Sequence, residues 1–253
     1  MKLIIRADDL GFSEGVNCGI HKAIDGGMVT CVGLMTNMES AKHGYHLIKD
    51  YPVCIGLHTN VCAGSPISDP SKIPSLVQQN GEFCRSREIH QRKEDLIVIE
   101  EAEIEIEAQL QRFRDITGRN PDYLEFHAIS SQNFMQAIQN VANRHGLFYE
   151  NPIFDKEWEK QYGIKGFDFA KMDEKGLYNP YDYMTEHLKD LENNDCCIAV
   201  FHPGYLDQYI LTHSSFTNIR AMECEFLCSD WLKQWIKEHQ IQLVDFRNYK
   251  NGE

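Results

Sequence analysis

Short apolar runs alternate with longer amphipathic segments along this chain of 253 residues. This alternation restricts the fold more than any other feature, because strands that alternate with helices form a parallel sheet covered by helices. About seven such runs predict a distorted or incomplete (β/α) barrel of the glycoside hydrolase and deacetylase type, in a single domain over residues 1–253. The predicted strands are Lys2–Arg6, Cys31–Thr36, Val53–Leu57, Tyr123–Phe126, Gly146–Tyr149, Cys196–Phe201 and Gln242–Phe246.

The intervening segments have apolar residues three or four positions apart, which predicts helices over residues 14–24, 94–116 and 219–238. Ser13 is the predicted N-cap of the first helix, and Gly118 is predicted to end the second. Residues 63–92 and 151–179 lack such patterns and are predicted to be irregular. Loops of this length usually cover or line a functional site.

The composition excludes several classes of protein. A formal net charge of −13 argues against a nucleic-acid-binding surface, which needs a basic face. No apolar run approaches the roughly 20 residues that span a bilayer, so no membrane contact is expected. The chain enters a strand at once and lacks the pattern of a signal peptide, which favours a cytoplasmic protein. Nine cysteines, an odd number, fit reduced thiols that mostly fill the core.

Polar residues of a few types follow four of the predicted strands. The first strand leads into Asp8 and Asp9, and three later strands lead into His58, His127 and His202. The C-terminal ends of the strands share one face of an α/β barrel, and that face carries the active site. These residues, far apart in the sequence, are therefore predicted to meet.

One carboxylate and two imidazoles are a common ligand set for a catalytic divalent metal. Asp9, His58 and His127 are the predicted ligands of one divalent ion, Mg²⁺ or Zn²⁺, and manganese, iron or cobalt would suit the same ligands. The charge of the ion also explains why two carboxylates stand side by side. Asp8 and His202 remain for proton transfer.

These roles predict hydrolysis of an amide or an ester. A divalent ion lowers the pKa of water and stabilises a developing oxyanion. Asp8 would act as the general base, and His202 would protonate the leaving amine.

Six stretches of the sequence resemble the YdjC-like carbohydrate deacetylases, which include chitooligosaccharide deacetylases. The resemblance implies a distorted (β/α) barrel, a divalent metal and removal of N-acetyl groups from small sugars. It also implies metal ligands at Asp9, His58 and His127, a base at Asp8 and a functional histidine at His202. The stretches are ADDLGFSEGVNCGI, GLHTNVCAGSPIS, PSLVQQNGEF, EAQLQRFRDITGRNPDYLEFH, FHPGYLD and SSFTNIRAMECEFL.

The sequence departs from the family pattern at two of these places. Arg6 stands where the family usually has Asn, and Glu125 stands where it commonly has Asp. Arg6 is expected either to contact an anion or to compensate the charges of Asp8 and Asp9. Asn60 is expected to contact the sugar. Arg220 and Glu223 match an Arg-x-x-Glu pattern of the family, and are expected to contact the sugar, to contact the second subunit of a homodimer, or to form an ordinary ion pair at the start of a helix.

We therefore predict a metal-dependent hydrolase that deacetylates a small N-acetylated sugar such as an N-acetylglucosamine disaccharide. One alternative is a hydrolase that acts on a phosphorylated disaccharide such as cellobiose phosphate, with phosphate contacts from arginines. A second alternative is a sugar-binding protein on the same fold without turnover, because the sequence after His127 differs from the family. The arginines in question are Arg6, Arg85, Arg87 and Arg220.

Overall fold

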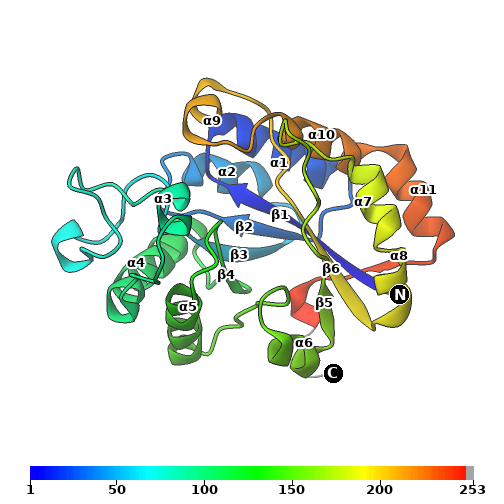
Figure 1. The fold of residues 1–253 in the computed structure, drawn as a ribbon. Helices are drawn as coiled ribbons and strands as arrows, with labels where there is room; N and C mark the ends of the chain where they lie inside the picture. The colour runs from blue at the N-terminus through cyan, green and yellow to red at the C-terminus, as the bar shows by residue number, and fades with distance from the viewer. Residues whose placement is uncertain (249–253) are drawn as a thin grey trace.

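A computed structural model describes residues 1–248 of the protein and shows one seven-stranded parallel sheet (Figure 1). The sheet curls into a half-barrel with helices around its outside, so the predicted incomplete (β/α) barrel is confirmed. The strand order is β4-β3-β2-β1-β6-β5, and β7 pairs with the start of β1. The strands are β1 (Lys2–Leu10), β2 (Cys31–Leu34), β3 (Cys54–Thr59), β4 (Leu124–Phe126), β5 (Ile164–Gly166), β6 (Cys196–Phe201) and β7 (Gln242–Leu243).

The helices connect and cover these strands. Within residues 1–248, none of them combines the length and the hydropathy needed to cross a membrane. Their bounds are α1 (Glu14–Asp25), α2 (Ala41–Ile48), α3 (Ser86–His90), α4 (Ile99–Thr117), α5 (Gln132–His145), α6 (Lys156–Tyr162), α7 (Pro180–Glu186), α8 (Leu188–Asn193), α9 (Gln208–His213), α10 (Asn218–Cys228) and α11 (Asp230–Glu238). Two 3₁₀ turns, η1 (Pro70–Lys72) and η2 (Phe246–Asn248), complete the set.

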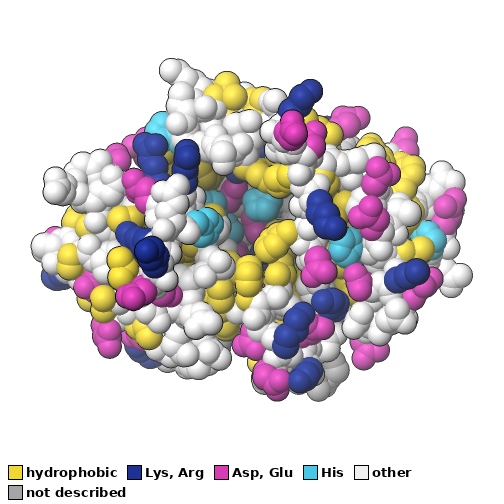
Figure 2. All heavy atoms as spheres, in the orientation of Figure 1, with side chains coloured by type: hydrophobic (Ala, Val, Ile, Leu, Met, Phe, Trp, Pro, Cys, Tyr) yellow, Lys and Arg dark blue, Asp and Glu magenta, His cyan; other side chains and the backbone are white. Residues whose placement is uncertain are grey.

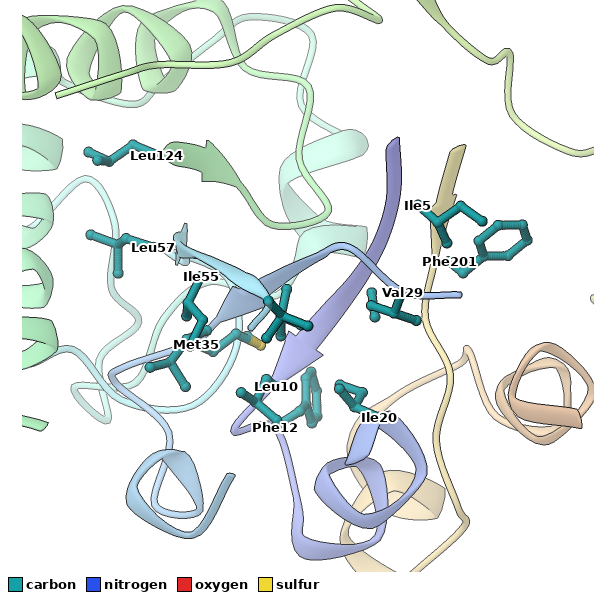
Figure 3. Close-up of a cluster of buried hydrophobic side chains, with 14 of the residues drawn as sticks. Ile5, Leu10, Phe12, Ile20, Val29, Met35, Ile55, Leu57, Leu124 and Phe201 are labelled. Atoms are coloured by element: carbon teal, nitrogen blue, oxygen red, sulfur yellow. The ribbon is translucent and has the colours of Figure 1, made fainter. Parts of the chain in front are cut away.

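The two faces of the sheet bury different residues, because successive side chains of a strand point to opposite faces. Leu3 and Ile5 of β1 belong to the large cluster between the sheet and the helices, which Figure 3 shows in part with Ile20 of α1. Ile4 belongs to a smaller cluster with Tyr123 and Phe246. This smaller cluster also contains Cys31, Cys54, Cys196 and Ile198 of the neighbouring strands.

Local signals placed several helix ends correctly. Ser13 caps α1, and its hydroxyl accepts a hydrogen bond from the Val16 N–H at 3.2 Å. Gly118 ends α4 in the left-handed conformation, with φ of 72°. The start of the second helix was predicted too early, since α4 begins at Ile99.

Four other predictions about the fold and core were wrong. Residues 219–238 form two helices, because Ser229 accepts a hydrogen bond from the Leu232 N–H and so begins α11. Residues 63–92 contain η1 and α3, and residues 151–179 contain α6 and β5, so neither stretch is irregular throughout. Gly146–Tyr149 contributes a single bridge between Leu124 and Tyr149 and no named strand. Cys18 is exposed on α1, although its neighbours suggested a core position.

Candidate metal centre and active site

The end of β1 is distorted where it carries the two aspartates. Ala7 pairs with Val32 and Leu10 pairs with Leu34, so Asp8 and Asp9 together face Gly33 of β2. Two residues opposite one define a β-bulge, which redirects side chains. Asp9 has φ of 75°, a left-handed conformation that residues other than glycine rarely adopt and that is typical of functional sites.

The bulge explains how two consecutive residues serve one site. In a regular strand Asp8 and Asp9 would point to opposite faces of the sheet. Here each places a carboxylate oxygen within 4.8 Å of a ring nitrogen of His58. The β1–β2 register therefore brings both carboxylates to the C-terminal ends of the strands.

Asp9, His58 and His127 bring three ligand atoms together. Asp9 Oδ1 lies 3.1 Å from His58 Nε2 and 2.9 Å from His127 Nδ1. The two ring nitrogens are 3.0 Å apart. Ligands at right angles, about 2.1 Å from a divalent ion, are about 3.0 Å from each other. The donor set and its spacing thus fit one face of an octahedral ion.

A second group of potential ligands, Asp8, His58 and Glu125, lies next to the first. It suits a cation less well, because the Arg6 guanidinium stands among its oxygens. Arg6 Nε is 2.8 Å from Asp8 Oδ1, and its Nη2 is 3.7 Å from Glu125 Oε2. His58 Nδ1 is hydrogen-bonded to Glu125, which turns His58 Nε2 toward Asp9 and His127. A carboxylate behind a histidine is the usual support of a metal ligand.

The carboxylate of Asp9 is held from behind by Arg220. Arg220 Nη2 donates to Asp9 Oδ2 at 2.7 Å, so Oδ1 remains directed at the two histidines. Burial alone would raise the pKa of Asp9, but the charges of His127 and Arg220 and hydrogen bonds from the histidines hold that pKa well below its usual range. Asp9 is therefore an ionised, oriented oxygen donor.

The charges around His58 favour its protonated form when no metal is bound. Burial would lower its pKa, but the negative charges of Glu125 and Asp8 raise the pKa of His58 to about 10. A protonated imidazole cannot bind a metal ion, so binding must displace the proton.

We therefore expect each bound divalent ion to release about one proton near pH 8, because His58 is then still protonated in the metal-free protein. Apparent metal affinity should rise with pH until about 10, where the His58 proton is lost anyway. Titration calorimetry in two buffers that differ in ionisation enthalpy measures the release. Identical binding enthalpies in both buffers would contradict the protonated state of His58.

Arg6 neutralises the carboxylates behind the candidate ligands. Besides its contacts with Asp8 and Glu125, it forms an ion pair with Glu150. Arg6 and Glu125, the two residues that depart from the family pattern, are thus neighbours. The guanidinium of Arg6 faces the side chain of Glu125, which is longer than the Asp that the family commonly has there. Gly33 makes room for this cluster, since a Cβ there would lie 2.8 Å from Glu125 Oε1 and 3.0 Å from Asp8 Oδ1.

His202 lies on the other side of the centre, after β6. Its backbone N–H donates to the buried carboxylate of Glu223, whose other oxygen accepts from the Tyr178 hydroxyl at 2.6 Å. Burial lowers the pKa of His202 to about 4, although the charges of Asp9 and Asp8 oppose this change. Its ring packs against Phe216 at a centroid distance of 5.0 Å. The imidazole is therefore neutral at neutral pH.

The structure brings Asp8, Asp9, His58 and His127 together, and the charges of Asp8 and Asp9 act on His202. The four predicted sugar contacts are buried. Arg6 is 6% exposed, and Arg220 and Glu223 are no more than 2% exposed. Asn60 is fully buried. These side chains bind other protein groups, and direct contact with a sugar gains no support from this placement.

Asn60 shapes the loop that follows β3. Its amide donates to Asn37 Oδ1 at 3.0 Å and to the Ala63 carbonyl at 2.7 Å. Its Oδ1 accepts from the N–H groups of Cys62 and Ala63, both at 3.0 Å. All these bonds stabilise the turn beside His58.

Sequence reasoning missed two participants in this network, Glu150 and Tyr178. Glu150 directly follows the apolar run Gly146–Tyr149, so the pattern that revealed Asp8 and the histidines also applied to it. Tyr178 lies in a predicted irregular stretch and carried no signal, because its contact with Glu223 joins residues 45 positions apart.

The site opens at His127, whose side chain is 12% exposed against 1% for Asp9. Figure 2 shows a hollow over the C-terminal end of β1, with histidine and acidic side chains at its bottom and hydrophobic side chains along its edge. A small molecule entering this hollow would meet His127 before the buried ligands.

Comparisons with known proteins agree with this architecture. The YdjC-like protein family matches residues 2–238. "Carbohydrate deacetylase 2" of Listeria innocua serovar 6a is 31% identical to this chain, and the match covers 98% of each. A "Carbohydrate deacetylase" of Brevibacillus brevis is 32% identical and covers 97% of this chain and 98% of its own.

A crystal structure with the same fold has also been solved. It is a "putative cellobiose-phosphate cleavage protein" from Enterococcus faecalis V583, with a TM-score of 0.84 and 22% identity over 98% of both chains. At that identity the likeness speaks for the fold. The family match covers nearly the whole chain, including every residue of the site, and so this protein belongs to the YdjC-like family.

Proposed function

We propose that the protein is a divalent-metal-dependent hydrolase that removes the N-acetyl group from a small N-acetylated sugar, such as an N-acetylglucosamine disaccharide. The convergence of Asp9, His58 and His127 within 2.9–3.1 Å of one another, beside a second carboxylate, is the observation that carries the proposal. The names of the two carbohydrate deacetylases support the choice of substrate.

In this proposal Asp9, His58 and His127 hold the ion. When bound, a divalent ion supplies Lewis acidity, which activates water and stabilises the oxyanion of the transition state. Glu125 and Arg220 keep two of the ligands in position through His58 Nδ1 and Asp9 Oδ2. Arg220 is thus proposed as a positioning residue rather than a sugar contact.

Asp8 is the proposed general base. Arg6 reaches both of its oxygens, with Nε 2.8 Å from Oδ1 and Nη2 2.8 Å from Oδ2. The hydrogen bond from Nη2 to Oδ2, together with the ion pair between Nε and Oδ1, fixes the orientation of the carboxylate. Asp8 can then receive the proton of the attacking water without leaving its place.

His202 is the proposed proton donor to the leaving amine. With a pKa of about 4 it is neutral at neutral pH, so in this proposal it takes up a proton from solvent before it passes that proton to the leaving nitrogen. Once protonated, a group of such low pKa gives its proton readily to an amine, which is strongly basic. Glu223 and Arg220 form hydrogen bonds with the backbone of His202, and these bonds would keep its side chain beside the leaving nitrogen of the substrate.

Replacing His202 with alanine should separate amide from ester substrates. An amine needs a proton as the C–N bond breaks, whereas an activated phenolate leaves without one. We expect acetate release from the N-acetylated sugar to slow by about 10²–10⁴-fold, and hydrolysis of an activated acetate ester to change little. Both rates are measured on the same folded, metal-loaded preparation. Equal losses of rate on the amide and on the ester would contradict a role of His202 in proton transfer.

The proposal is tested by the products that the metal-loaded protein forms. Acetate released from an N-acetylglucosamine disaccharide, and lost after chelation, is the expected result. Phosphate or free glucose released from a phosphorylated disaccharide would instead favour the phosphorylated-sugar hydrolase. Of the four arginines considered for phosphate binding, Arg6 and Arg220 are already paired with carboxylates. Binding of the disaccharide without any product would indicate a sugar-binding protein.

A further inference from the structure

Two phenylalanines near the site are unusually exposed. Phe154 is 43% exposed and Phe169 is 66% exposed, and their ring centroids lie 5.9 Å apart. Phe154 also contacts Phe126, at a centroid distance of 5.5 Å. Phe126 directly precedes the proposed ligand His127. We call Phe126, Phe154 and Phe169 the aromatic ladder.

The topology places the ladder at the active end of the barrel. Phe126 is the last residue of β4, and Phe169 follows the C-terminal end of β5. Phe154 follows Tyr149, which bridges to β4 at Leu124. The three rings therefore lie at the C-terminal end of the sheet, as Asp8, His58 and His202 do, but on β4, after β5 and after the bridge residue Tyr149. The hydrophobic side chains along the edge of the hollow in Figure 2 lie over this part of the fold.

Exposed rings in a row are costly unless something covers them. Burying a phenylalanine contributes about 1.5–3 kcal/mol, a gain that two of these rings largely forgo. Exposed apolar patches beside a site usually mark the place where a ligand or a partner binds. Phe154 and Phe169 lie outside both hydrophobic clusters, which further suggests a role other than packing.

The chemistry of the ladder suits a sugar ring. One face of a pyranose presents several C–H groups, and the electron-rich face of an aromatic ring attracts them. The rings are tilted to one another by 59° and 48°, at centroid distances of 5.5 and 5.9 Å, so their faces are directed differently and do not stack on one another. The net charge of −13 disfavours an anionic ligand and suits a neutral one.

We propose that the aromatic ladder is a second sugar subsite. It would bind the sugar ring adjoining the one whose acetyl group lies at His127, so the preferred substrate has at least two sugar units. This inference rests on the proposed function for the position of the acetylated ring. It adds a binding site of its own, built from residues that take no part in the chemistry.

The test compares binding of N-acetylglucosamine and of its β-1,4-linked disaccharide to metal-loaded protein by titration calorimetry. The Asp8→Asn variant provides the background, so that the sugars are not consumed. Adding Phe154→Ala and Phe169→Ala should weaken disaccharide binding about tenfold, equivalent to about 1.4 kcal/mol, and change monosaccharide binding less than about twofold. Trp231→Ala is the matched control, because Trp231 is also exposed, at 38%, but lies on α11 at the far side of the sheet (Figure 1).

Two results would overturn the subsite. The first is unchanged disaccharide affinity in the double variant, and the second is an equal loss of affinity for both sugars. The single variant Phe169→Ser, at the most exposed ring, repeats the test if the double variant melts at a lower temperature.

The same experiment separates the subsite from the reaction. If the ladder variants lose the preference for the disaccharide while the wild type releases no acetate, the subsite stands and the proposed reaction falls. If the wild type releases acetate and the ladder variants bind both sugars like their parent, the reaction stands and the subsite falls.

Discussion

Replacing His58 with alanine is expected to remove the tightly bound divalent metal and, with it, acetate release. Asp9 and His127 alone leave two ligands, and a carboxylate and one imidazole compete poorly with water for a dication. Loss of groups that merely support a ligand costs about 10–100-fold in metal affinity, so loss of the ligand itself should cost more than about 10²-fold. Metal content after dialysis, measured with the dissociation constant, gives the result. His127→Ala should behave in the same way.

A matched control separates this effect from a general effect of losing a histidine. His90 is exposed on α3, and His90→Ala should keep the metal content and the activity of the wild type. Equal metal content in the wild type and in both ligand variants would rule out the proposed ligand set. Melting curves recorded without metal show whether each variant is folded, so loss of metal is not confused with loss of structure.

Replacing Asp8 with asparagine should lower kcat by about 10²–10⁴-fold while the metal stays bound. Asparagine keeps the shape of the side chain and can still accept a hydrogen bond from Arg6, but its amide cannot take a proton from water. Arg6 also retains its ion pair with Glu150, so the buried cation is not left alone. Metal content and kcat are measured on the same preparation.

Asp9→Asn provides the comparison for this variant. It should weaken metal binding, because Asp9 Oδ1 is one of the three converging ligand atoms. If Asp8→Asn loses the metal and Asp9→Asn keeps it, the two aspartates have exchanged roles. The Arg6 contacts on both oxygens of Asp8 argue against that exchange, since a guanidinium already occupies the place of a cation.

The position of the site could be predicted from the sequence because it depends on a simple rule. Parallel strands end at one face, so the residues that follow Ile5, Leu57 and Phe126 had to meet there. Short apolar runs bounded by turn residues were enough to find β1, β2, β3, β4, β6 and β7. The alternation of side chains along a strand also explains why Glu125 lies two positions before His127 and touches His58.

What the sequence concealed was the distortion and the long-range pairing. A bulge at Asp8 and Asp9 depends on the register between β1 and β2, which no local pattern reveals. Arg220 contacts Asp9 across 211 positions of the sequence. The sequence alone therefore could not show whether Arg220 is buried beside a candidate ligand or exposed to a substrate. The break at Ser229 was missed because the apolar periodicity continues through it, although Ser followed by Asp is an ordinary helix start.

The position of a bound ion tests the account most directly. Anomalous diffraction from a crystal loaded with Co²⁺ would locate the ion without reference to activity. We expect one peak bounded by Asp9 Oδ1, His58 Nε2 and His127 Nδ1, with Asp8 beside it and still paired with Arg6. An ion held by Asp8 and Glu125, or an ion that none of these residues binds, would contradict the proposed centre.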